Sequence, residues 1–403
     1  MEYLELEKVY YKKKNVEDEY NKRSNDYSTI KTNLYISPLI RGEKSKKNYE
    51  LFLLPLPKLL VLQNQIIENS KKIKEILEEI SDFAVRSCIL DLAGKEIIQT
   101  NEIEGVHSTK KEIYDEINFK KKSKDSQIIS SYLDLLSGNY PKIKKFEEIR
   151  KIYENLFDQK VLEEEGNALD GKFFRKTPVF IYNNEDKKIH AGINSEEQIE
   201  ENMKALIEFM NNKEILPLLK SAITHYFIEY IHPFYDGNGR FGRYIYSMYL
   251  SKKYDIFTGI SLSYAMKMNH KKYLNSFLQV GKEKNYGEIT FFVINMLEII
   301  IDGQVSTINL LEDKKTIYTF MKDKIKEMKL EEIQEEILIK ISEMYLFSKN
   351  IAIKHNDLCD ILNISSYKLR KNIDILIENK LLERVRKTPT VYGLGEELYK
   401  LID

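Results

Sequence analysis

Apolar residues recur three and four positions apart over most of this chain, which is the spacing of an amphipathic α-helix. The clearest run starts near Pro57, a residue tolerated in the first turn of a helix, and continues through Leu62, Ile66 and Ile73. An extended segment should precede it at 51–57. Similar runs predict further helices at 16–27, 83–98, 143–157, 196–211, 217–231, 265–280, 288–301 and 308–328. We therefore expect a mainly α-helical protein.

The helical spacing stops between residues 173 and 194. Two segments rich in β-forming residues, 177–182 and 188–193, flank a polar turn at 183–186, which predicts a small β-hairpin. An isolated hairpin is unusual in an otherwise helical domain, so its presence needs an explanation.

The last part of the chain has its own order of elements. Three helices and then a β-rich tail are expected there, which is the order of a winged helix-turn-helix domain. These helices should lie at 335–345, 354–362 and 367–379. The chain should then divide into an N-terminal helical region at 1–95, a core at 96–310, a helical linker at 311–334 and the winged-helix domain at 335–403.

Composition narrows the class of protein. The 63 lysines and arginines balance 63 aspartates and glutamates, which excludes the global basic field of a protein devoted to nucleic acid or to an anionic membrane. Cys88 and Cys359 lack metal-ligand spacing, so neither a disulfide framework nor a zinc site is expected. The N-terminus lacks the apolar segment of a signal peptide, and no stretch resembles a membrane span. We expect a cytoplasmic protein with no membrane partner.

One short stretch near the middle of the chain carries most of the reactive side chains. Its run Gly237-Asn238-Gly239 can adopt positive φ angles, and directly before a helix such a run points successive backbone N–H groups toward one place. The helix dipole adds to this anion cradle, whose natural ligand is a phosphate group. Arg240 and Arg243 are three positions apart on the following helix, so both guanidinium groups can bind phosphate oxygens.

The same stretch contains a carboxylate and a base. Asp236 stands beside the expected phosphates, where Mg²⁺ is usually held by one or two protein oxygens together with substrate oxygens. His232 has an ordinary pKa near neutrality and can take a proton from an attacking hydroxyl. Phe234 should point into the core and fix the loop. These residues predict phosphoryl or nucleotidyl transfer.

The full stretch 232–243 resembles the signature of the Fic family, His-Pro-Phe-x-Asp/Glu-Gly-Asn-Gly-Arg-x-x-Arg, at every specified position. The resemblance implies a helical core that binds ATP with Mg²⁺ and transfers AMP to a Tyr, Thr or Ser hydroxyl of a protein target or of itself. It also implies that the hairpin at about 177–193 is a flap that holds the target backbone as an added strand. The implied roles are His232 as base, Asp236 as the Mg²⁺ ligand, Gly237, Asn238 and Gly239 as the anion hole, and Arg240 and Arg243 as phosphate contacts.

A second motif lies at about 96–108. Thr100, Glu104 and Gly105 match the inhibitory motif of the same family, Ser/Thr-x-x-x-Glu-Gly/Asn. On a helix the first two would share a face, and the resemblance implies that the glutamate pairs with Arg243 and competes with the γ-phosphate of ATP. In some relatives this glutamate also assists removal of AMP. Taken alone, a Glu-Gly pair at a helix end is more often a simple C-cap.

Several alternatives stay open. A basic patch suited to DNA phosphates is formed by Lys368, Arg370 and Lys371 with further basic residues near the wing. Winged-helix domains also serve protein docking or dimerisation, so a homodimer is allowed. The second hypothesis is therefore a DNA-binding regulator whose core senses nucleotide. Transfer of phosphate, UMP or phosphocholine would use nearly the same loop. His225 has no third ligand at fitting spacing, so a buried, hydrogen-bonded histidine is expected there rather than a metal ligand.

Overall fold

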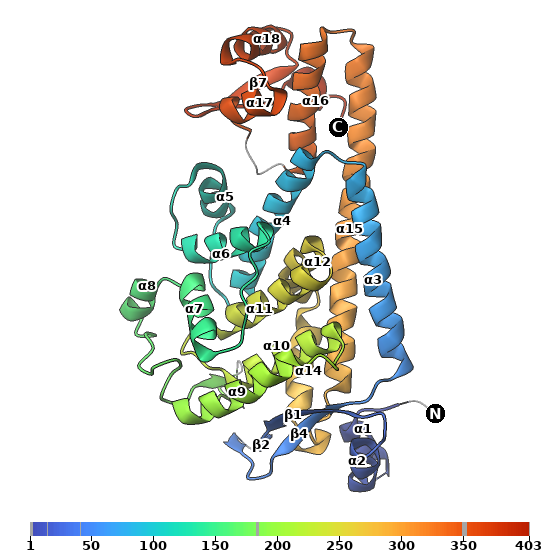
Figure 1. Cartoon of the computed structure of the whole chain (residues 1–403), viewed down its shortest axis with the longest axis vertical. Coiled ribbons are helices and arrows are strands. Elements are labelled where there is room, and N and C mark those ends of the chain that lie inside the picture. The colour runs from blue at the N-terminus through green and yellow to red at the C-terminus, as the bar shows by residue number, and fades with distance from the viewer. Residues whose placement is uncertain (1–2, 14, 41, 183–184, 349–352, 403) are drawn as a thin grey trace. The chain divides into compact units, whose positions relative to one another are not determined.

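The computed structural model describes residues 3–13, 15–40, 42–182, 185–348 and 353–402 (Figure 1). It is mainly α-helical, as the sequence predicted, and the strands of the described part pair into two-stranded antiparallel sheets. Unit 1 contains residues 1–70, 96–108 and 124–304, and unit 2 contains residues 71–95, 109–123 and 305–403. Three boundaries between these two compact units fall within α3 (Pro57–Glu78), α4 (Asp82–Ile103) and α15 (Thr290–Glu327), and two fall on either side of α5 (Lys110–Phe119).

Unit 1 combines a small N-terminal part with a larger set of helices. The N-terminal part contains α1 (Leu6–Lys13), α2 (Val16–Ser24), β1 (Ile30–Ile36), β2 (Leu39–Ile40), β3 (Glu43–Lys44) and β4 (Tyr49–Leu53). The elements that follow are α6 (Ser126–Leu136), α7 (Phe146–Leu156), α8 (Gln159–Glu164), β5 (Phe180–Tyr182), β6 (Lys188–Ala191), α9 (Glu196–Asn211), α10 (Pro217–Ile231), α11 (Asn238–Lys253), α12 (Ile256–Ile260), α13 (Leu262–Met268), α14 (His270–Val280) and the 3₁₀ helix η1 (Glu283–Asn285).

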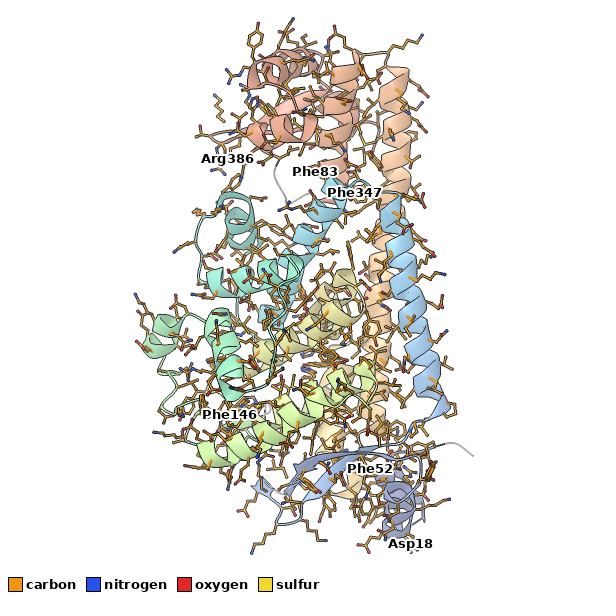
Figure 2. All side chains as sticks on the ribbon, in the orientation of Figure 1. Asp18, Phe52, Phe83, Phe146, Phe347 and Arg386 are labelled. Carbon is orange, nitrogen blue, oxygen red and sulfur yellow. The ribbon has the colours of Figure 1, made fainter. Side chains whose placement is uncertain are left out.

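The N-terminal region is not helical throughout, so the prediction for 1–95 was wrong in part. β1 pairs antiparallel with β4, with Ile30 opposite Leu53 and Ile36 opposite Tyr49. Along β1, buried and exposed side chains alternate, which is the period of a strand with one face on a core. Phe52 of β4 packs with residues of α1 and α2 (Figure 2). The extended segment and the helix start at Pro57 agree with the prediction.

α15 is one continuous helix of 38 residues where the sequence predicted two. Gln304 lies between the two predicted helices, and its side chain is buried and donates to the Ile66 carbonyl (3.1 Å) and the Thr258 hydroxyl (2.9 Å). The predicted linker at 311–334 therefore falls on the end of α15 and the start of α16 (Glu332–Phe347). Among the described residues α15 is also the one helix long and apolar enough to cross a membrane, yet 67% of its apolar window is buried, as in a core helix.

α10 and α11 form the centre of unit 1. Nearly every residue of α10 is buried, and a helix that is apolar on all sides belongs inside a domain. α10 packs against both α9 and α11, and the short connection between α10 and α11 carries the predicted reactive stretch. The loop is therefore anchored at both ends by buried helices.

The remaining elements belong to unit 2. Its helices are α5 (Lys110–Phe119), α16 (Glu332–Phe347), α17 (His355–Leu362), α18 (Ser366–Glu378) and α19 (Glu396–Tyr399), and its hairpin is β7 (Leu382–Lys387) with β8 (Thr390–Leu394). Three helices followed by a hairpin is the order that the sequence predicted for 335–403. Assignment of these elements to a winged-helix domain stays a prediction.

A buried ion pair ties α2 to the segment before α15. Arg23 donates from Nη1 to Glu288 Oε2 (2.8 Å), and their side chains are only 5% and 1% exposed. Tyr3 donates its hydroxyl to the other carboxylate oxygen (2.6 Å). Burial raises the pKa of Glu288, and the Arg23 guanidinium opposes that rise. The carboxylate therefore depends on Arg23 to stay charged in the interior.

Replacing Arg23 by Met should lower the free energy of unfolding of unit 1 by about 3–5 kcal/mol, because Glu288 would lose its buried partner. Chemical denaturation followed by circular dichroism measures this loss. The control is Lys8→Met, which breaks an ion pair whose lysine is 60% exposed and should cost less than about 1 kcal/mol. Equal losses in the two variants would contradict the structural role given to Arg23.

Candidate catalytic site

The loop between α10 and α11 is held by an aromatic anchor. His232 follows α10 with a φ of 52°, which turns the chain out of the helix. Phe234 is fully buried, as predicted, and stacks on Tyr153 with ring centroids 3.7 Å apart. The Asn238 side chain accepts from the Phe234 N–H (2.9 Å) and donates to the Phe234 carbonyl (2.8 Å). These contacts fix the loop backbone from both sides.

The structure changes what is expected of Asn238. Asn238 was predicted to line the anion hole, and its side chain is 2% exposed with both polar atoms bonded to the backbone of Phe234. Its side chain braces the loop, and its contribution to an anion site is its backbone N–H. These two roles of Asn238 could not be separated from the sequence alone.

An anion cradle lies at the start of α11. Gly237 is the N-cap residue with a φ of 77°, and the first backbone N–H groups of a helix have no partner within it. A Cβ on Gly237 would lie 2.7 Å from the Phe157 ring, and one on Gly239 would lie 2.2 Å from Glu104 Oε1. Both glycines are therefore needed for close approach. The Glu104 carboxylate itself lies against the cradle.

Arg243 lies in the second turn of α11, and each of its three guanidinium nitrogens has a hydrogen-bond or ion-pair partner. Its Nε donates to the Thr100 hydroxyl (2.8 Å), its Nη2 to the Thr100 carbonyl (3.0 Å), and its Nη1 pairs with Glu104 Oε1 (2.8 Å). The Arg243 side chain is 1% exposed. Burial acts to lower the pKa of Arg243, but the negative charge of Glu104 raises it above its ordinary value.

The residues of the predicted inhibitory motif lie at the C-terminal end of α4, where a glycine C-cap was the alternative expectation. The helix ends at Ile103, so Thr100 lies within it and Glu104 in the turn that follows, rather than on one helical face as predicted. Gly105 has a φ of 71°, and the Val106 N–H returns to the Asn101 carbonyl (2.9 Å), which is the geometry of a glycine C-cap. This C-cap geometry directs the Glu104 side chain toward Arg243.

Asp236 and Arg240 are partners in this structure. Arg240 donates from Nη2 to Asp236 Oδ2 (2.8 Å), and its guanidinium lies 4.7 Å from the centre of the Phe157 ring. Within the described residues no group of three His, Cys, Asp or Glu side chains could hold a metal ion. A single, 43% exposed carboxylate fits the way Mg²⁺ is usually held, with most ligands supplied by water and substrate phosphates.

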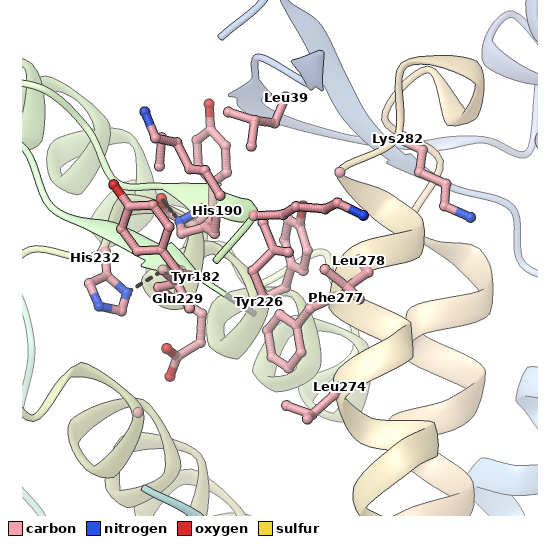
Figure 3. Close-up of a pocket in the computed structure, with 18 of the residues that line it drawn as sticks. Leu39, Tyr182, His190, Tyr226, Glu229, His232, Leu274, Phe277, Leu278 and Lys282 are labelled. Atoms are coloured by element: carbon pink, nitrogen blue, oxygen red, sulfur yellow. Dashed lines mark hydrogen bonds between the residues drawn. The ribbon is translucent and has the colours of Figure 1, made fainter. Parts of the chain in front are cut away.

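His232 lies at the edge of the cradle as a neutral base. Its Nδ1 is 3.4 Å from the Glu229 carbonyl, which can only accept, so Nδ1 carries the proton and Nε2 is left to take another (Figure 3). Burial first, and then the positive charge of Arg175, lowers the pKa of His232 to about 4. The imidazole is therefore uncharged at neutral pH.

Arg175 positions this base and was not found from the sequence. It is fully buried, and its Nε donates to the His232 carbonyl (2.8 Å) while its backbone N–H donates to the Pro233 carbonyl (3.2 Å). Arg175 contacts a residue 57 positions away in the chain, and no local sequence pattern predicts such a contact. His190 lies nearby, with its ring centre 6.0 Å from that of His232.

The predicted hairpin is formed by β5 and β6 and lies beside the base. Ile193 donates to the Ile231 carbonyl (3.0 Å), and a Cβ on Gly192 would lie 3.1 Å from the His232 Cβ. The three side chains of β5 are 38–52% exposed, although each is apolar or aromatic. Residues 183–184 of the predicted turn lie outside the described residues. The use of this hairpin as a flap stays a prediction.

A cavity of about 1210 Å³ lies beside part of this site (Figure 3). Asp236 and Arg240 are not among the described residues that line it. It is lined by the hairpin β5–β6, by β2 and β3, and by one face each of α10 and α14. His232, Gly239, Arg243 and Glu104 all reach it. The base and the buried arginine therefore face the same space.

Three comparisons with known proteins bear on this site. The Fic/DOC family model matches residues 144–250. These residues form a Fic/DOC domain. A protein adenylyltransferase Fic from Nematostella vectensis is 28% identical over 130 residues, which is 32% of this chain and 27% of that protein. The chain thus matches about a quarter of the length of that relative.

One solved structure shares its fold with most of this chain. A Fic family protein from Desulfovibrio desulfuricans has a TM-score of 0.51 at 19% identity and covers 85% of this chain and 97% of its own. A Fic domain containing signaling protein from Bacteroides thetaiotaomicron has a TM-score of 0.42 at 15% identity, over 63% of this chain and 95% of its own. The Fic/DOC domain contains the loop and the hairpin, whereas Thr100 and Glu104 precede it.

His225 and Glu229 lie on the face of α10 that meets α11. His225 is buried and its Nε2 is 3.0 Å from the Tyr273 hydroxyl, which agrees with the expected hydrogen-bonded histidine. Glu229 was not predicted to matter, yet it lines the cavity and its buried Oε1 has no hydrogen-bond partner among the described residues. Burial, and then repulsion by Glu104, raises the pKa of Glu229 to about 8.

Glu229→Gln should raise the melting temperature more at pH 8 than at pH 5. A carboxyl group whose folded pKa is raised contributes stability that is present below its unfolded pKa and is lost as pH rises toward about 8, whereas Gln stays neutral throughout. Thermal melts from about pH 5 to pH 8 measure the difference. Glu208→Gln, at an exposed position of α9, is the control. A difference from wild type that is independent of pH would contradict the neutral state of Glu229.

Proposed function

We propose that this chain is a protein adenylyltransferase, which transfers AMP from ATP to a Tyr, Thr or Ser hydroxyl of a protein and releases pyrophosphate. The observation that carries the proposal is the buried Arg243 at the helix N-terminus, facing the same cavity as a neutral His232. The Fic/DOC domain and the adenylyltransferase name of its Nematostella relative support it. ATP is then the substrate, and a protein target or the chain itself is the acceptor.

His232 acts as the general base in this reaction. Its Nε2 takes the proton of the target hydroxyl as the oxygen attacks the α-phosphorus of ATP. A new bond from oxygen to phosphorus forms, the bond between the α-phosphorus and the bridging oxygen breaks, and pyrophosphate leaves. The Nδ1 proton on the Glu229 carbonyl keeps the ring oriented during the transfer.

The cradle and the two arginines bind the phosphates. Backbone N–H groups at the start of α11 meet one phosphate, while Arg240 and Arg243 meet the oxygens of the leaving group. Asp236 would hold Mg²⁺, which when bound balances the negative charge of the α- and β-phosphates. To hold the cation, Asp236 would give up its contact with Arg240, and its carboxylate is 43% exposed.

Glu104 inhibits the enzyme by occupying the place of the γ-phosphate. Its carboxylate already bonds to Arg243 and lies against Gly239. Two negative groups cannot share one guanidinium and one helix terminus without strong repulsion. ATP bound in the presence of Glu104 therefore lies with its phosphates out of line for the transfer.

The variant Glu104→Gly should incorporate AMP about tenfold faster than wild type or more, since about 1.4 kcal/mol of restored phosphate binding is a factor of ten. The measurement is intact mass of the protein after incubation with ATP and Mg²⁺, with the added mass of AMP on the chain or on a test protein. In the double variant His232→Ala, Glu104→Gly the incorporation should disappear.

The matched control is Glu102→Gly, two residues earlier, at the end of α4. Glu102 is exposed and pairs with Lys267 rather than with the site, so this variant should keep the wild-type rate. Incorporation that rises equally in the Glu102 and Glu104 variants would refute inhibition by Glu104. Incorporation that survives loss of His232 would refute the proposed base.

A further inference from the structure

We propose that unit 2 binds double-stranded DNA through one cationic face, built from three segments. We define the cationic face as the residues Lys368, Arg370 and Lys371 of α18, Arg384, Arg386 and Lys387 of β7, and Lys120, Lys121 and Lys122 after α5. This inference is independent of the proposed enzyme activity.

The first segment is the exposed side of α18. This helix follows α17 after a short turn in which Asn363 has a φ of 50°, and its inward side chains, including Leu369 and Ile373, are fully buried. Tyr367 is 81% exposed, and Arg370 is exposed beside it. In helix-turn-helix proteins the N-terminal residues of the second helix reach base edges. Here that position carries an aromatic ring and cations.

The second segment is the β7–β8 hairpin, which lies against the same end of α18. His355 links the two, since its Nδ1 is 2.9 Å from the Tyr392 hydroxyl of β8 and its Nε2 is 2.8 Å from the Ser366 hydroxyl of α18. Arg384 of β7 pairs with Asp374 of α18 at 3.4 Å, with both side chains well exposed. Such an exposed pair contributes little and can be replaced by a phosphate contact.

The third segment is the lysine run from Lys120 to Lys122, which follows α5. Phe119 ends α5 in the same unit, and two cations lie over its ring: the Arg386 guanidinium at 4.0 Å and the Lys354 ammonium at 5.6 Å. Lys120 follows at once with a φ of 54°, which turns the chain into the remaining lysines. The lysine run therefore extends the charge of the hairpin.

Duplex DNA fits this face better than duplex RNA. The major groove of B-DNA is about 12 Å wide and admits a helix such as α18, whereas the deep, narrow major groove of A-form RNA excludes side chains. Cations on either side of the helix would then meet the flanking backbone phosphates, which fix register and give affinity. Because the whole chain has a formal net charge of zero, this binding depends on the local face rather than on overall charge.

The test measures fluorescence anisotropy of a labelled random-sequence DNA duplex of about 30 bp against the full chain over a range of salt concentrations. Wild type should bind with a dissociation constant of about 10⁻⁶–10⁻⁴ M that weakens steeply with salt. Changing Lys120, Lys121 and Lys122 to Gln should weaken binding about tenfold and reduce the salt slope by about 1–3. Arg370→Gln with Lys371→Gln should do the same.

The matched control changes Lys71, Lys72 and Lys74 of α3 to Gln, which removes the same charge from unit 2 at exposed positions outside the cationic face. It should keep wild-type affinity and salt slope. Equal weakening in this control, or equal affinity for an RNA duplex of the same length, would overturn the proposal. The variant His232→Ala should keep full DNA binding, so failure here is distinct from failure of the enzyme proposal.

Discussion

A guanidinium that is removed from water needs a negative partner, and the site of this protein is built around that requirement at Arg243. Removing a charge from water costs several kcal/mol unless charged and polar groups replace the solvent. Here Thr100 accepts two of its hydrogen bonds and Glu104 supplies the charge, while Gly239 leaves room for the carboxylate. Any anionic ligand of Arg243 must therefore replace Glu104 rather than join it.

The partners of Arg243 differ in how easily they can leave. Thr100 lies within α4, but Glu104 lies in the turn beyond the helix, on a side chain that is 35% exposed. The loop between α10 and α11 is by contrast fixed by the Asn238 bonds to Phe234 and by the hydrogen bond from Arg175 to the His232 carbonyl. The enzyme proposal thus pairs a preorganised base and cradle with one displaceable carboxylate, so release of Glu104 would decide when the reaction runs.

Features set by local sequence could be predicted, and features set by distant contacts could not. The helices around the loop follow from apolar spacing, and the loop follows from a signature of adjacent residues. The strand β1 was missed because its alternation is short and its partner β4 is needed to recognise it. Arg175 and Glu229 were missed because burial between elements, not their neighbours in the chain, gives them their roles. The continuity of α15 likewise depends on the buried partners of Gln304.

Competition for Arg243 can be measured without any turnover. ATP and ADP differ by the γ-phosphate, so calorimetric titration of each nucleotide with Mg²⁺ isolates the contact that Glu104 is proposed to block. Wild type should bind the two nucleotides with nearly equal affinity, whereas Glu104→Gly should prefer ATP by about tenfold, about 1.4 kcal/mol for a charged phosphate contact. A wild-type protein that already prefers ATP as strongly as the variant does would contradict the competition between Glu104 and the γ-phosphate.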